Sequence, residues 1–137
     1  MAQPRGQQQG RGEGDAVSGR KSRNKGAAAE RELLKLLGDE LGVMLARNLV
    51  QTREGGADCL QVSGFAIEVK RQEQLSRPAW WRQACEQAER VSAEPLLFYR
   101  RNREPWTAWI HTTAGKWREG SIQDAACAIR EKWMRWP

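Results

Sequence analysis

Histidine and cysteine are scarce in this sequence. A single histidine, His111, and three widely spaced cysteines, Cys59, Cys85 and Cys127, occur among its 137 residues. An odd number of cysteines without a Cys-x-x-Cys pair supports neither a disulfide framework nor a zinc site, so we expect three small buried side chains. No serine or cysteine is placed to partner His111, which argues against Ser-His-Asp or Cys-His catalysis and predicts a structural histidine.

Long apolar runs are also missing. No stretch approaches the roughly 18 apolar residues of a membrane-spanning helix, and the N-terminal segment lacks the apolar core of a signal peptide. Residues 1–24 are mostly Gly, Gln, Arg, Ser and Lys, and so polar a segment cannot offset the entropy lost on ordering. We therefore expect a cytoplasmic protein without membrane contact, with residues 1–24 as a disordered basic arm and residues 25–137 as one folded domain.

Positive charge is in excess. The chain has 23 Lys and Arg against 17 Asp and Glu, a formal net charge of +6. This balance favours polyanionic partners, of which nucleic acid is the first candidate. The basic arm could follow DNA nonspecifically or serve only as a solubilising tail, and both interpretations stay open.

The folded part is predicted to alternate helices and strands. Apolar residues at helical spacing predict a first helix that begins at Lys25 and stops at Gly42. A strand over 43–52 follows, and two more, over 58–62 and 65–72, surround a tight Ser63-Gly64 turn. We then expect a helix over 77–92, a buried strand over 95–101, a partly exposed strand over 106–112 and a helix over 121–136. This order is typical of an α/β protein whose mixed sheet is flanked by helices.

Two charged side chains share one face of the predicted strand over 65–72. Residues two apart in a strand point the same way, so Glu68 and Lys70 are paired while Val69 points into the core. Asp58 follows a Gly-Gly-Ala turn, and the hairpin register places it across from Glu68. Two carboxylates can then converge on Mg²⁺ or Mn²⁺, which prefer oxygen ligands.

An isolated Glu-x-Lys is more often a solvated strand face. Here the Asp58 turn stands ten residues earlier, and Glu30 lies on the first turn of the preceding helix. These residues resemble the PD-(D/E)xK nucleases, and within them the Holliday junction resolvases of archaeal and phage type, over about residues 25–110. The matching residues are Lys25, Gly26, Glu30, Arg31 and Glu32 for the helical pattern, Ala57-Asp58 for Pro-Asp, and Glu68-Val69-Lys70 for Glu-x-Lys. Ala57 departs from the usual Pro, which shapes the turn and has no chemical role.

The resemblance implies a restriction-endonuclease-like fold and a metal-dependent DNA endonuclease, selective for branched DNA and assembled as a homodimer. It implies that Asp58, Glu68 and the Val69 carbonyl hold the metal, that Glu30 binds it directly or through water, and that Lys70 serves the nucleophile. A repair or restriction-like nuclease with another substrate, and a catalytically idle nucleic-acid-binding module on the same fold, remain as alternatives.

Further polar residues near this site are candidates for binding nucleic acid, with ordinary solubilising charge, or a solvated helix face for the glutamines, as the open alternative. Cationic side chains can hold phosphates, and related nucleases often place a glutamine on the second helix. Four tryptophans are expected to be core or dimer-interface anchors rather than base-stacking platforms. The candidate contacts are Lys25, Arg53, Arg71 and Gln83, with Gln87 as the alternative glutamine; the tryptophans are Trp80, Trp81, Trp106 and Trp109.

Overall fold

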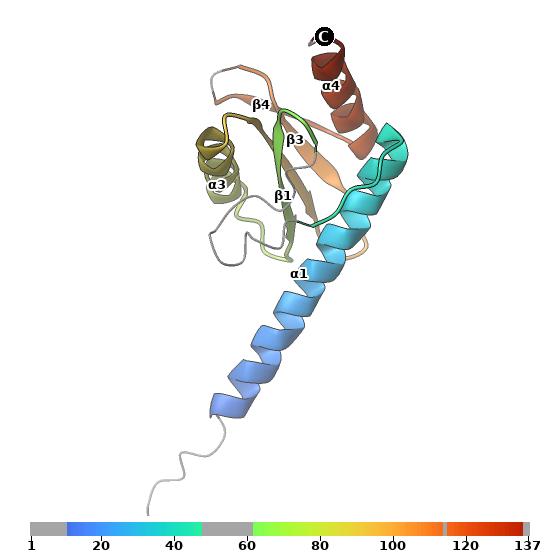
Figure 1. The fold of residues 1–137 in the computed structure, drawn as a ribbon. Coiled ribbons are helices and arrows are strands. Elements are labelled where there is room, and N and C mark those ends of the chain that lie inside the picture. Colours follow the sequence, from blue (N-terminus) through green and yellow to red (C-terminus); the bar gives the residue numbers. More distant parts are fainter. Residues whose placement is uncertain (1–10, 48–61, 114, 136–137) are drawn as a thin grey trace, which may run out of the picture.

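The fold has three layers, with a sheet between helices (Figure 1). The computed structural model describes residues 11–47, 62–113 and 115–135, and the side chains of the first helix from Gly26 onward. Within these ranges the helices are α1 (Arg11–Leu41), α3 (Arg77–Arg90) and α4 (Ile122–Arg135). The strands are β1 (Phe65–Arg71), β2 (Glu94–Arg100), β3 (Thr107–His111) and β4 (Trp117–Gly120).

The sheet is mixed, as the sequence predicts. Its described strands lie in the order β1-β2-β3-β4; β1 and β2 are parallel, and the other neighbours are antiparallel. A parallel pair needs a long connection across one face of the sheet, and α3 provides it. Helices α1 and α4 contact the opposite face. The predicted α/β class is therefore confirmed.

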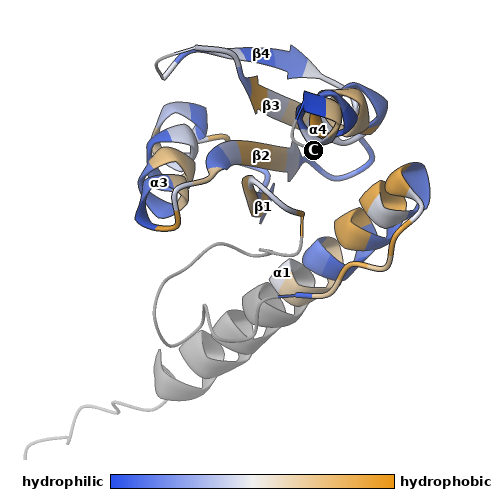
Figure 2. Ribbon diagram, turned by 45° about the horizontal axis from the view of Figure 1, so that its top comes forward, coloured by the Kyte–Doolittle hydropathy of each residue, from blue (hydrophilic) through white to orange (hydrophobic). Residues whose placement is uncertain are grey.

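Each face of the sheet has its own apolar core. Alternate residues of β1, β2 and β3 pack under α1 and α4, where Leu33, Ile67 and Phe98 are fully buried. On the α3 side, Trp80, Trp81 and Trp109 pack against β2, and Trp106 is buried in the larger core. The four tryptophans are thus core residues, as expected. Figure 2 shows the apolar strands β2 and β3 lying between α3 and α4.

Residues 43–47 differ from the predicted strand. They have irregular structure, Met44 is almost fully exposed, and residues 48–52 lie outside the described ranges. After α1 ends, Gly42 takes a left-handed φ of 72° and the Val43 amide donates to the Gly38 carbonyl at 3.0 Å. This helix-terminating bond turns the chain back along α1, and the apolar residues follow that return rather than a strand's alternation.

The turn at Ser63 and Gly64 is present, with a φ of 84° at Gly64. Of the strand predicted before it, Val62 lies in a bend and residues 58–61 lie outside the described ranges.

Helix α1 starts at Arg11, within the predicted arm, although the sequence predicts a start at Lys25. No proline interrupts residues 11–25, so a packed helix can propagate toward its N-terminus one hydrogen bond per residue. The division into arm and domain stays a prediction.

The C-terminal half has one strand that the sequence analysis missed. Strand β4 pairs with β3, yet it contains no β-branched residue and is largely hydrophilic (Figure 2). By covering one side of β3, β4 helps to bury Ala108, Trp109 and Ile110, so β3 is more buried than predicted. Its partner contacts, rather than its pattern, make β4 a strand.

Helix α4 begins where the sequence predicts. Ser121 and Asp124 bond reciprocally to each other's backbone N–H, which satisfies two donors at the helix start and holds the pKa of Asp124 below its usual range. The cysteine expectation was wrong in two cases: Cys85 is only half-buried at the edge of the core under α3, and Cys127 is exposed on α4. Cys59 lies outside the described ranges.

None of the helices in the described part of the chain is long and apolar enough to span a bilayer.

Candidate active site

Glu68 and Lys70 lie together on β1. They occupy alternate positions next to Leu97 and Tyr99 of β2, and so they share the sheet face that α3 covers. The Lys70 Nζ is 3.3 Å from Oε1 of Glu68. Val69, between them, points into the opposite core. The structure thus brings this predicted pair together with the predicted alternation.

The Glu68 carboxylate is in an unusual electrostatic state. Burial raises the pKa of Glu68, the charge of Glu30 raises it further, and the neighbouring Lys70 ammonium lowers it, with burial as the largest effect. Its Oε2 is buried and accepts no hydrogen bond from the described residues. A buried carboxylate oxygen without a donor is costly, so this position favours a cation.

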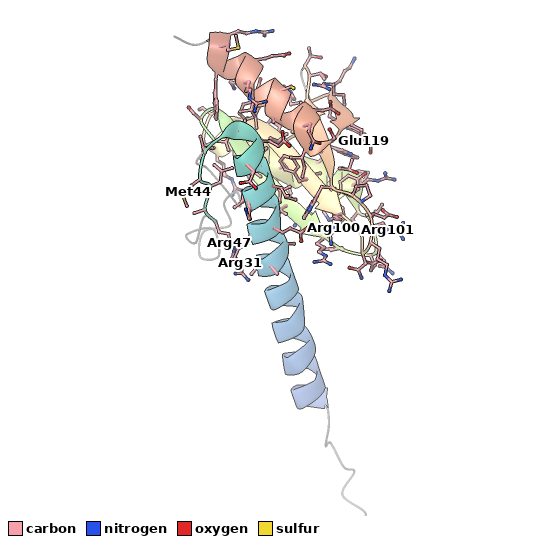
Figure 3. The ribbon with its side chains drawn as sticks, turned by 90° about the vertical axis from the view of Figure 1, so that its right-hand side faces the viewer. Arg31, Met44, Arg47, Arg100, Arg101 and Glu119 are labelled. Carbon is pink, nitrogen blue, oxygen red and sulfur yellow. The ribbon has the colours of Figure 1, made fainter. Side chains whose placement is uncertain are left out.

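Glu30 contributes the second carboxylate. It is buried on α1 beside the apolar core, and its charge acts on Glu68. Arg47 donates through Nε to Oε2 of Glu30 at 2.5 Å, and both side chains are largely buried. Figure 3 shows Arg47 next to Arg31 on one side of α1, where the returning segment 43–47 runs.

The donor set fits a divalent cation. Among the side chains that the structure describes, no three His, Cys, Asp or Glu gather as a metal cluster. Two carboxylates, Glu30 and Glu68, are nevertheless close enough to repel each other, and Oε2 of Glu68 accepts no hydrogen bond from a described residue. The predicted third ligand, Asp58, lies outside the described ranges, as does Arg53. Oxygen donors of this kind suit Mg²⁺ or Mn²⁺.

The predicted DNA contacts fall in different places. Arg71 lies at the end of β1 on the face opposite Glu68, half-buried, and donates to Asn102 Oδ1 at 3.3 Å. Gln83 is exposed on α3, whereas Gln87 is buried on the side that faces the sheet. Lys25 lies within α1, and its side chain is outside the described part of the chain. Of the two glutamines, Gln87 therefore faces the site's side of the sheet.

Sequence reasoning missed two arginines. Arg47 was not considered, because nothing in its neighbours marks it as a partner of a residue 17 positions earlier. Arg100 was missed as well: it donates to Oε1 of Glu32 at 2.5 Å and lies over the Trp106 ring at 5.7 Å. Glu32 also accepts from Trp106 Nε1. The resemblance contained Glu32 without giving it a role, and the structure gives it a structural one.

Comparisons with known proteins identify the family and the fold. Residues 21–132 match the family described as "Phage putative PDDEXK endonuclease". The fold is similar to that of Archaeoglobus fulgidus Hjc, a Holliday junction resolvase from an archaeal hyperthermophile, with a TM-score of 0.53 and 19% identity over 73% of this chain and 97% of that chain. No curated protein matches the sequence. The resemblance to PD-(D/E)xK nucleases is thus confirmed, and the fold is restriction-endonuclease-like.

Proposed function

The chain belongs to the phage PDDEXK endonuclease family, and on that premise we propose that it is a metal-dependent endonuclease that hydrolyses phosphodiester bonds in branched DNA. One observation carries the proposal. The buried Glu68 places one oxygen beside Lys70, its other oxygen accepts no hydrogen bond from the described residues, and a second carboxylate, Glu30, is close by. A site for binding alone gains nothing from carboxylates near phosphate, because like charges repel.

We assign the metal ligands as follows. Glu68, Asp58 and the Val69 carbonyl would hold Mg²⁺ or Mn²⁺, and Glu30 would bind it directly or through water. When bound, the metal would stabilise negative charge on the scissile phosphate and lower the pKa of a water molecule. Arg47 keeps the Glu30 carboxylate in place from the outer side.

Lys70 is assigned to the nucleophile. Its Nζ is paired with Glu68 and its side chain is only one-fifth exposed, so its position is well defined. From there its ammonium would orient the attacking water, and only as the neutral amine would it accept that water's proton. Lys25, Arg53, Arg71 and Gln83 remain the proposed contacts to the DNA, with Gln87 as the buried alternative.

Branched DNA and a two-fold dimer are the more specific parts of the proposal. They are supported by the fold that this chain shares with a Holliday junction resolvase. A four-way junction cut in two symmetric strands matches a homodimer with two equal sites. The net charge of +6 supports DNA as the partner.

The test uses four labelled substrates: a four-way junction, a fork, a linear duplex and a single strand. The full chain is incubated with each in Mg²⁺ or in EDTA, beside Glu68→Gln, and its mass is measured by light scattering. We expect Mg²⁺-dependent cleavage of the junction first, none by Glu68→Gln, and a dimer. Preferred cutting of linear duplex would replace the resolvase with a repair or restriction-like nuclease. Absence of cleavage with intact binding would leave an idle binding module.

A further inference from the structure

The turn between β2 and β3 carries a group of arginines. Arg100 ends β2, and Arg101 and Arg103 follow within the turn. Arg100 is engaged by Glu32 and Trp106. Arg101 and Arg103, in contrast, are exposed, and within the described part of the chain their side chains form neither an ion pair nor a hydrogen bond. Figure 3 shows Arg100 and Arg101 on the side of α1 away from Arg47.

The turn is held in place by its own residues. The Glu104 amide donates to the Arg101 carbonyl at 3.2 Å, and the Asn102 amide donates to Glu73 Oε1 at 2.8 Å. Arg71 donates to the Asn102 side chain, which joins the turn to the end of β1. These bonds satisfy Glu73 and Asn102 and leave two cations directed to solvent on a fixed backbone.

Arg103 adopts a backbone conformation that rarely suits it. Its φ is 62°, in the left-handed region that glycine and asparagine enter more easily. An asparagine here would relieve part of a strain of about 1 kcal/mol. The strained arginine is therefore not explained by the turn's own stability.

The turn lies at the same end of the sheet as the candidate active site. In the parallel register Lys70 is opposite Tyr99 and Arg71 is opposite Arg100. Arg101, the next residue after β2, therefore lies just beyond the level at which β1 ends. With strands about 4.8 Å apart and a rise of about 3.3 Å per residue, the Lys70 and Arg101 backbones are on the order of 8 Å apart. If a DNA strand has one phosphate held at Lys70, a phosphate only a few nucleotides away along that strand is therefore near Arg101.

From these observations we infer that the β2–β3 turn binds the DNA backbone beside the scissile phosphate, through Arg101 and Arg103. The inference rests on the proposed function and adds the surface that holds the strand next to the cut. The two guanidiniums can each bind a phosphate through two N–H groups. Glu104, exposed in the same turn, acts against them, because its charge repels the phosphates.

The experiment measures binding of a labelled four-way junction and a labelled duplex by fluorescence anisotropy in EDTA, across a salt series. Arg101→Gln and Arg103→Asn each remove one charge; the asparagine also suits the left-handed backbone, so weaker binding cannot be attributed to a distorted turn. Arg90→Gln is the matched control, because Arg90 is exposed at the end of α3, toward the other end of β1. Glu104→Gln tests the sign of the charge effect.

Each arginine variant is expected to lower the slope of log affinity against log salt by about 0.9, and the double variant by about 1.8, on both DNAs. Arg90→Gln should keep the wild-type slope, and Glu104→Gln should bind more tightly. The single-turnover rate at saturating DNA should not change in Mg²⁺. Wild-type protein that binds and cleaves DNA, with turn variants that behave like Arg90→Gln, overturns the inference alone. Wild-type protein that neither binds nor cleaves overturns the proposed function and the inference with it.

Discussion

Lys70 reaches only one oxygen of Glu68: its Nζ lies 3.3 Å from Oε1, while the buried Oε2 accepts no hydrogen bond from the described residues. Within the described residues, one oxygen of the carboxylate is therefore stabilised by an ion pair and the other accepts no hydrogen bond. This asymmetry makes the site testable without any measurement of activity.

The first prediction concerns the stability of the metal-free protein. The raised pKa of Glu68 means that the folded protein favours the protonated carboxyl. The stability that this protonated side chain contributes is present at low pH and is lost as the pH rises through the raised pKa. In EDTA, Glu68→Gln should therefore melt at a higher temperature than wild type at pH 8. The gap should narrow toward about pH 4, where the carboxyl is protonated even in the unfolded chain.

Added Mg²⁺ should raise the melting temperature of wild type and change that of Glu68→Gln much less, because only a ligand that binds the folded state stabilises it. Differential scanning calorimetry measures both effects. Equal melting temperatures of the two proteins in EDTA at pH 8 would contradict the electrostatic account of this site.

The second prediction concerns Lys70. If it orients or deprotonates the nucleophile, Lys70→Ala should lower the single-turnover rate by roughly 10²- to 10⁴-fold, the range for acid–base groups, and change junction affinity little. Lys70→Arg should restore little, since a guanidinium keeps the charge but is bulkier and cannot accept a proton at neutral pH. Wild-type rates from Lys70→Ala at saturating DNA would remove Lys70 from the mechanism.

The third prediction concerns the ion pair between Glu30 and Arg47. Both side chains are mostly buried, so Arg47→Ala leaves a buried carboxylate without its donor and should cost about 1–3 kcal/mol of unfolding free energy. Arg31→Ala is the control, because Arg31 is exposed on the same helix and forms no ion pair within the described residues. Urea unfolding measures the difference. Adding Glu30→Gln to Arg47→Ala should recover part of the lost unfolding free energy. If the losses of the two single variants simply add in the double variant, the pair is not coupled.

The fourth prediction concerns the packing of β4. Glu119 Oε1 accepts hydrogen bonds from the Tyr99 hydroxyl at 3.0 Å and from Trp109 Nε1 at 3.1 Å. Glu119→Ala removes the acceptor of both part-buried donors and should cost about 1–3 kcal/mol, while Glu119→Gln keeps a carbonyl oxygen there and should cost less. Chemical unfolding followed by tryptophan fluorescence distinguishes them. An alanine variant as stable as the glutamine variant would mean that water replaces the carboxylate.

The sequence predicted those parts of the site that lie within one element. Glu68, Val69 and Lys70 follow from the two-residue period of a strand, which depends on neighbouring residues alone. The contact between Arg47 and Glu30 depends on how the chain returns along α1, which no local period encodes. Gln83 and Gln87 show the intermediate case: both lie on a correctly predicted helix, but only packing decides that Gln87 faces the sheet.

The same reason explains the errors in the fold. The apolar residues 43–46 have the composition of a strand but follow the return from α1, and β4 has the composition of a loop but pairs with β3. In both cases tertiary contacts outweigh propensity. The arginines of the β2–β3 turn were equally invisible, because the register of β1 and β2 places them near Lys70, some 30 positions earlier in the chain.

The bond from Val43 to Gly38 also sets how far the effects of mutation reach. A Cβ at position 38 would lie 2.5 Å from the Val43 carbonyl oxygen, closer than real contacts allow, so an alanine there must push the returning segment off α1. That segment carries Arg47 to Glu30. In a mutagenesis screen, Gly38 would then score like a catalytic residue although it has no functional group. Positions sensitive to substitution therefore include residues without a chemical role, because one backbone contact determines where the Arg47 side chain lies.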